Sequence, residues 1–162
     1  LAEKGHNDSI FNLSNMYYEG IGTIQNYRLS LKYCWLCALN GNKKCIRKID
    51  KVKSKVTEKI IEQVANQIPQ ILEKNFVEFN NPKSAFKLGF WYENFSPEID
   101  YEQSYLWYSV SVSGGIYKAM KLRDRVGEEI EAEKIVELQT KAEEILTKNK
   151  YFNEGKETEG NI

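Results

Sequence analysis

Apolar residues along the chain recur at intervals of three and four positions, which is the period of an amphipathic helix. The first such stripe could be capped by Asp8 or Ser9 and ends at Gly20 and Gly22, residues able to adopt the left-handed conformation found after many helices. Its members are Ile10, Leu13, Met16 and Tyr17. A second stripe ends at Gly41 and consists of Ser30, Tyr33, Cys34, Cys37 and Ala38. The pattern predicts a helical hairpin.

The same pattern returns about 75 positions later. Phe11, Leu13 and Tyr17 then coincide with Phe86, Leu88 and Tyr92, and Gly41 coincides with Gly115. Asn81-Pro82 can start the second hairpin, since proline is tolerated in the first turn of a helix. Its second stripe is Ser104, Trp107, Tyr108, Ser111 and Val112. We infer a tandem duplication, with copy one over residues 5–75 and copy two over residues 82–148.

Each hairpin is followed by a longer helical tail, beginning near Thr57 and near Glu128. Thr57 is the expected N-cap of the first tail, and its apolar stripe runs up to Pro69, where we expect the helix to stop or kink. The pattern predicts one all-helical domain over residues 1–150. The polar end of the chain, 151–162, is predicted to be disordered.

The segment that joins the two copies, residues 42–81, is too apolar for a disordered linker. The residues that need burial are Ile49, Val52, Val56, Ile61, Val64, Ile68, Ile71 and Leu72. We therefore expect these helices to dock against the hairpins, so that the chain forms one compact monomer. The alternative is that the stripe pairs with a second copy and forms a dimer.

These spacings resemble the Sel1-like repeats, helical hairpins related to tetratricopeptide repeats. Copy one supplies Leu13, Tyr17, Gly20, Gly22, Ala38 and Gly41 of that pattern; copy two supplies Leu88, Gly89, Tyr92, Asp100, Trp107, Tyr108 and Gly115. Copy two departs from the pattern at Phe95 and Pro97, so the loop between its helices must differ in shape. The resemblance implies an all-α, right-handed superhelix of two diverged repeats. It also implies a segment of a longer bacterial protein, because Leu1 to Gly5 resembles the end of a preceding repeat.

Helical repeat proteins bind partners on a concave face lined by non-core positions of the first helices. In this chain those positions are Asn12, Asn15, Glu19, Lys87, Phe90 and Asn94. We therefore predict a non-enzymatic scaffold or adaptor that binds protein partners. The resemblance further implies bacterial signalling or host interaction, including virulence, in the periplasm, at the envelope or outside the cell.

The sequence holds no recognisable catalytic, metal-binding or cofactor-binding constellation. The single histidine, His6, has no plausible nucleophile beside it, and the glycines of Gly20-Ile21-Gly22 do not follow a strand as a dinucleotide loop would. Cys34 and Cys37 form a C-x-x-C pair in the middle of a predicted helix, where we expect buried, unreactive thiols. An enzyme that uses its acidic side chains remains an alternative function.

Charge balance argues against a nucleic-acid partner, because 23 basic residues face 23 acidic ones. No apolar run is long enough to span a membrane. The charges are unevenly placed: eight basic residues lie between Lys43 and Lys59, and seven acidic residues lie between Gly127 and Glu144. These groups could pair within the chain, pair between chains, or keep helix faces solvated. Pairing between chains would make the protein a structural, oligomerising module, which is the second alternative.

Overall fold

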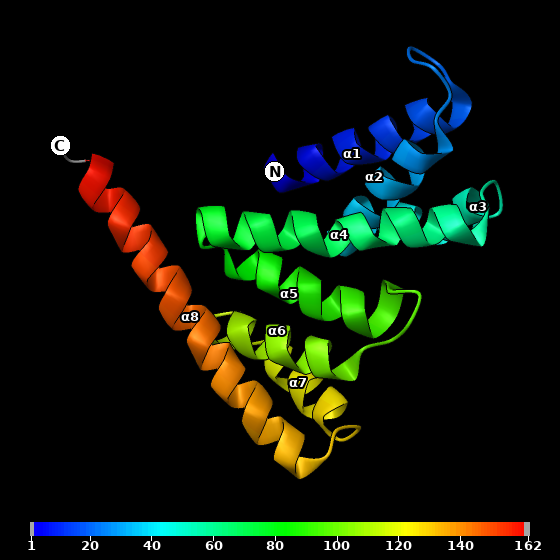
Figure 1. Cartoon of the computed structure of the whole chain (residues 1–162). Coiled ribbons are helices and arrows are strands. Elements are labelled where there is room, and N and C mark those ends of the chain that lie inside the picture. Colours follow the sequence, from blue (N-terminus) through cyan, green and yellow to red (C-terminus); the bar gives the residue numbers. More distant parts are fainter. Residues whose placement is uncertain (1, 161–162) are drawn as a thin grey trace. The chain divides into compact units, whose positions relative to one another are not determined.

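The computed structural model describes the backbone of residues 2–160 and the side chains of residues 8–150. All regular structure in this part of the chain is helical, as the sequence predicted (Figure 1). The elements are α1 (Ala2–Glu19), α2 (Tyr27–Leu39), α3 (Lys43–Lys53), α4 (Glu58–Phe79), α5 (Pro82–Phe90), the π-helical turn η1 (Trp91–Phe95), α6 (Tyr101–Ser113), α7 (Ala119–Gly127) and α8 (Ala132–Gly160).

The chain divides into two compact units, residues 1–68 and residues 69–162. Each unit is described by itself, and the expectation that they form one compact monomer stays a prediction. The boundary falls within α4, which continues through Pro69 to Phe79. Of the two outcomes expected at Pro69, a stop is therefore wrong, and a kink stays a prediction. A proline removes one backbone hydrogen bond, but the stripe of Ile68, Leu72 and Phe76 is buried and favours a continuous helix.

In the first unit, α2 packs against both α1 and α3. The inner face of α1 differs from the predicted stripe: Ser14 and Tyr18 are buried, whereas the side chain of Met16 is 40% exposed. Ser14 Oγ donates a hydrogen bond to the carbonyl oxygen of Ser30, and Ser30 Oγ donates one to the carbonyl oxygen of Ser14, both at 2.9 Å. Two small residues thus bring these helices close together.

The segment after Gly41 is ordered helix in the first unit. Asn42 caps α3, and its side-chain oxygen accepts a hydrogen bond from the backbone nitrogen of Lys44 at 2.9 Å. The predicted N-cap of α4 is confirmed, because Thr57 Oγ1 accepts from the backbone nitrogen of Ile60 at 3.3 Å. Of the residues in this segment that were expected to need burial, Ile49, Val52, Val64 and Ile68 are buried, whereas Val56 and Ile61 are half-buried.

In the second unit, α6 lies at the centre and contacts α5, α7 and α8. The predicted start of α5 is confirmed, with Asn81 as N-cap and Pro82 in the first turn. As expected, the loop after α5 differs from its counterpart after α1, because the chain continues into η1 instead of ending at a pair of glycines. α8 extends to Gly160, across most of the segment predicted to be disordered. Residues 161–162 lie outside the described residues.

Three pairs of hydrogen bonds and one pair of backbone angles recur in the two units, 74 or 75 positions apart. Ser104 Oγ donates to the carbonyl oxygen of Gly89 at 2.8 Å, as Ser30 Oγ does to that of Ser14. Other recurring features are the side-chain caps of α2 and α6 by Asn26 and Asp100, the backbone bonds from Asn26 to Tyr17 and from Asp100 to Tyr92, and the positive φ angles of Gly41 and Gly115.

Candidate functional site

One surface of the first unit combines polar side chains of α1 with lysines of α3. We call it the α1–α3 surface and define it by Phe11, Asn12, Asn15, Tyr18, Glu19, Lys44, Lys48 and Lys51. Asn12, Asn15 and Glu19 share one face of α1, because residues spaced by three and four positions are neighbours on a helix. Lys44, Lys48 and Lys51 are spaced in the same way on α3. Two helices therefore present parallel rows of polar groups.

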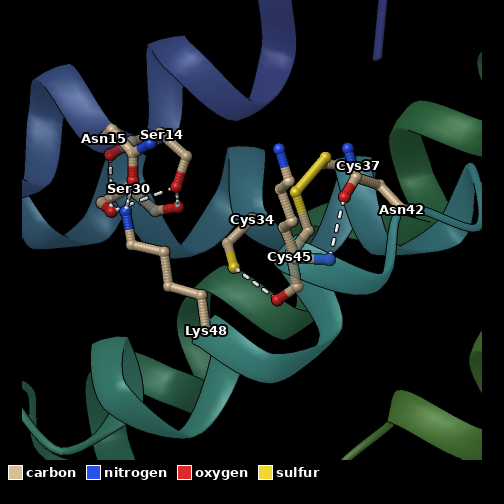
Figure 2. The surroundings of a disulfide bond; sticks show 9 residues. Ser14, Asn15, Ser30, Cys34, Cys37, Asn42, Cys45 and Lys48 are labelled. Atoms are coloured by element: carbon tan, nitrogen blue, oxygen red, sulfur yellow. Dashed lines mark hydrogen bonds between the residues drawn. A yellow bond between two sulfur atoms is a disulfide. The ribbon is translucent and has the colours of Figure 1, made fainter. Parts of the chain in front are cut away.

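Lys48 is held against α1 by several groups at once. Its ammonium group donates a hydrogen bond to Asn15 Oδ1 (Figure 2). It also lies 4.9 Å from the ring centroid of Tyr18 and 5.9 Å from that of Phe11. Partial burial lowers the pKa of Lys48, an effect opposed by nearby groups that include Glu19. Lys48 therefore fixes the position of α3 beside α1 and carries a partly desolvated ammonium group.

The neighbouring lysines also lie over aromatic rings. Lys44 Nζ is 5.7 Å from the ring centroid of Phe11, and Lys51 Nζ is 5.0 Å from that of Tyr18. A cation over an aromatic face is attracted by the electron-rich π system, which is worth about 0.5–1 kcal/mol at an exposed site. The rings thus hold three ammonium groups in a row along the surface, and Lys44 and Lys51 remain exposed to solvent.

Within residues 8–150, no carboxylate forms an ion pair with a basic residue of α3. The helix carries six basic residues and a single acidic residue, Asp50. Like charges at this density repel one another unless a counter-charge is supplied. The α1–α3 surface is therefore a local excess of positive charge in a chain whose formal net charge is zero.

The aligned surface of the second unit is neutralised in part by its own chain. Lys118 lies over Phe86 at 4.6 Å, as Lys44 does over Phe11. At the positions that align with Tyr18 and Lys51, however, the second unit has Glu93 and Arg125, which form an ion pair at 2.7 Å. The side chain of Glu93 is 8% exposed and also accepts a hydrogen bond from the Tyr108 hydroxyl group at 2.9 Å. At the position of Lys48 it has Leu122.

The residues predicted to bind a partner have different surroundings in the two copies. In copy one, Asn12 and Glu19 are exposed, and Asn15 is half-buried against Lys48. In copy two, Phe90 packs against Phe86 and Phe95, with ring centroids 6.3 and 5.4 Å apart.

The other two predicted residues of copy two differ in exposure. Lys87 is half-buried, whereas Asn94 is exposed. Asn94 Nδ2 donates to the carbonyl oxygen of Phe90 and to Glu93 Oε1, both at 3.3 Å.

Sequence reasoning missed the three lysines of this surface. Their spacing, Lys44, Lys48 and Lys51, was a visible signal, because it places basic groups on one face of a predicted helix. The aromatic rings beneath them could not be assigned from sequence, since those contacts join residues 33 positions apart in the chain.

The structure corrects the expectation that Cys34 and Cys37 are both free, unreactive thiols. Cys37 and Cys45 form a disulfide bond, which joins the end of α2 to the first turn of α3 (Figure 2). The turn at Gly41, where φ is +86°, reverses the chain and brings the two cysteines together. Cys34 is a buried free thiol, as predicted, and its Sγ donates to the carbonyl oxygen of Cys45 at 3.2 Å.

The environment of Cys34 does not favour nucleophilic chemistry. Burial raises the pKa of the thiol to about 11, and the nearby positive charge of Lys48 only partly offsets this effect. A nucleophilic cysteine needs a lowered pKa and access to solvent. The thiol acts here as a small packing group between α2 and α3.

Neither a metal-binding cluster nor a membrane-spanning helix is found among the described residues. No group of three or more His, Cys, Asp or Glu side chains among them is arranged to hold a metal ion. No helix within residues 2–160 is long and apolar enough to cross a membrane. In comparisons with known proteins, no protein-family model, curated protein or solved structure matches this chain.

Proposed function

We propose that this chain is a non-enzymatic protein-binding module, built from two diverged helical repeats, that binds its partner on the α1–α3 surface. The repeat relationship is supported by the contacts that recur 74 or 75 positions apart, such as Ser30 to Ser14 and Ser104 to Gly89. Duplication of one ancestral hairpin explains why a serine at the equivalent position of each copy joins the two helices of its hairpin by a hydrogen bond. The Sel1-like spacing supports a right-handed superhelix for the stacked hairpins.

The observation that carries the binding assignment is the difference between the two units at aligned positions. In the second unit, the acidic side chain of Glu93 neutralises Arg125. In the first unit, Lys51 has an aromatic ring beside it instead of a carboxylate. A fold that can neutralise this surface internally, and does so in one copy, leaves the other copy with charges that a partner can neutralise.

The disulfide bond bears on where the protein acts. Disulfide bonds persist in oxidising compartments and are rare in reducing ones. The bond between Cys37 and Cys45 therefore supports the periplasm, the envelope or the extracellular space, which the Sel1-like resemblance also favours. The same resemblance supports a role in bacterial signalling or host interaction.

The proposed function is tested by selecting peptides from a random library displayed on phage, with the folded chain as bait. The variant Asn12→Trp places a bulky ring on the exposed α1 side of the surface. Its matched control is Asn66→Trp, which makes the same change at an exposed position of α4 in the same unit. We expect the selected peptides to bind the wild-type chain and the control, and to lose binding to Asn12→Trp.

Two outcomes contradict the proposed function. One is a set of selected peptides that bind Asn12→Trp and Asn66→Trp equally well, because their site then lies elsewhere. The other is a library that yields no peptide enriched on this chain over an unrelated helical domain. Circular dichroism of both variants establishes that the helices remain folded.

A further inference from the structure

The row of ammonium groups on α3 has a defined spacing along the helix axis. Lys44, Lys48 and Lys51 are separated by four and three residues, which corresponds to about 6 and 4.5 Å at a rise of 1.5 Å per residue. Side chains on one side of an extended peptide are about 6.6 Å apart, because alternate residues point the same way. Acidic residues at alternate positions of an extended segment therefore match the first interval closely and exceed the second by about 2 Å, a difference that the flexible lysine side chains can span.

Aromatic contacts limit what else can bind here. The faces of Phe11 and Tyr18 are occupied by the ammonium groups of Lys44, Lys48 and Lys51. Single-stranded nucleic acids bind proteins largely by stacking bases on open aromatic faces. Rings that are already covered by cations do not offer such faces, so the surface favours a ligand that contacts the ammonium groups.

The second unit indicates which anion this place in the fold accepts. Lysines bind carboxylates and phosphates alike, so the three lysines do not decide between them. In the second unit the arginine at the aligned position, Arg125, does bind a carboxylate, that of Glu93. The fold itself thus shows a carboxylate at this place on α7, supplied there by its own chain.

We infer that the α1–α3 surface binds an acidic peptide segment in an extended conformation, with carboxylates at alternate positions over Lys44, Lys48 and Lys51. The inference rests on the proposed function and specifies the chemistry of the partner. Asn15 orients the central ammonium group through its hydrogen bond to Lys48. The peptide supplies the counter-charge that Glu93 supplies in the second unit.

The test is fluorescence anisotropy with the full chain and a labelled peptide of alternating glutamate and serine. Exposed ion pairs are individually weak, and the loss of three of them is expected to weaken binding on the order of 10-fold. We expect this loss with the triple variant Lys44→Gln, Lys48→Gln and Lys51→Gln. The matched control, Lys74→Gln, Lys141→Gln and Lys148→Gln, removes the same charge from exposed positions and leaves binding within about 2-fold.

Further peptides separate spacing and charge from other effects. The same peptide with glutamine in place of glutamate is expected to bind on the order of 10-fold more weakly. A peptide of the same composition with its glutamates in one block is expected to bind about 3-fold more weakly, because fewer carboxylates reach the row. Raising the salt concentration from 0.05 to 0.5 M is expected to weaken binding of the alternating peptide.

Several results overturn the inference. They are equal binding by the two triple variants, tighter binding of single-stranded oligothymidine or of phosphatidylserine vesicles than of the acidic peptide, and no binding of the acidic peptide by the wild-type chain. The proposed function fails separately. If library peptides bind this surface but are not acidic, only the inference about partner chemistry is wrong.

Discussion

α5 and α6 approach each other so closely at Gly89 that a side chain there has no room. A Cβ atom on Gly89 lies 2.5 Å from Cδ1 and 2.7 Å from Cε1 of the Tyr108 ring. The ring is buried and cannot swing away, because its hydroxyl group donates a hydrogen bond to Glu93 at 2.9 Å. We therefore predict that Gly89→Ser destabilises the second unit.

The loss in the free energy of unfolding caused by Gly89→Ser follows from two opposing effects. Replacing glycine in a helix by serine gains about 0.5 kcal/mol of helix propensity. Forcing extra atoms into a well-packed interface costs about 1–3 kcal/mol. Because contacts below 3.0 Å require the ring or the helix to move, the packing cost is the larger effect. The expected net loss in the free energy of unfolding is about 1–2 kcal/mol.

The first unit indicates a second substitution that should offset the loss caused by Gly89→Ser. At the aligned positions it has Ser14 and Cys34, a larger residue on the first helix and a smaller one on the second. Tyr108→Cys alone is expected to cost about 3–5 kcal/mol, since it leaves a cavity. The double variant should lose less than the sum of the two single losses, by about 1–3 kcal/mol.

Urea unfolding followed by circular dichroism measures each free energy, with an unchanged dependence on urea as the check that the transitions are comparable. The reasoning is refuted if Gly89→Ser is as stable as the wild type. It is also refuted if the losses of Gly89→Ser and Tyr108→Cys are additive, because the two side chains then do not compete for the same space.

Three further predictions concern the cysteines and a tyrosine. Cys34 is expected to react with iodoacetamide at pH 8 on the order of 100-fold more slowly in the folded chain than in urea, because burial raises its pKa to about 11; fast labelling of the native chain contradicts this. Reduction of the bond between Cys37 and Cys45, which are eight positions apart, is expected to lower the free energy of unfolding by about 2.5 kcal/mol, and no change with dithiothreitol would argue against the bond. Burial raises the pKa of Tyr92 from 10.0 to about 12, so the unfolded chain loses this proton first. Stability should therefore fall as the pH rises from 10 to 12, and Tyr92→Phe should reduce that fall in urea titrations at each pH.

The starts of α4 and α5 could be predicted from the sequence because capping is local, but the predicted cap of the first helix at Asp8 or Ser9 is wrong, since α1 begins at Ala2. Asn81 and Thr57 accept hydrogen bonds from backbone nitrogens two and three positions further on, so the pattern of a few residues decides where the helix begins. The turns at Gly41 and Gly115 are predictable for the same reason, since positive φ angles favour glycine.

The face of α1 that packs on α2 could not be predicted from hydrophobicity. The sequence places Met16 in the stripe, but the structure buries Ser14, which fits the close approach to Ser30. Shape and hydrogen bonding decide this contact, and neither has a periodic apolar signal. The stop at Pro69 was wrong for a related reason, because a buried stripe along α4 outweighs one missing hydrogen bond.

The candidate site was partly predictable. Helical spacing identified Asn12, Asn15 and Glu19 as one face of the first helix. The role of α3 depends on its placement beside α1, which is a tertiary contact. Phe90 aligns with Asn15 and was predicted to lie on the same binding face, but its contacts with Phe86 and Phe95 make it part of an aromatic cluster.

The binding surface is tested most directly by nuclear magnetic resonance of the full chain labelled with ¹⁵N, titrated with a peptide selected from the library. The account predicts shifts in the backbone amide signals of Asn12, Asn15 and Glu19 and of α3, with the aligned residues of α5 and α7 unchanged. Shifts confined to α5 and α7, or shifts that leave α1 and α3 untouched, would contradict it.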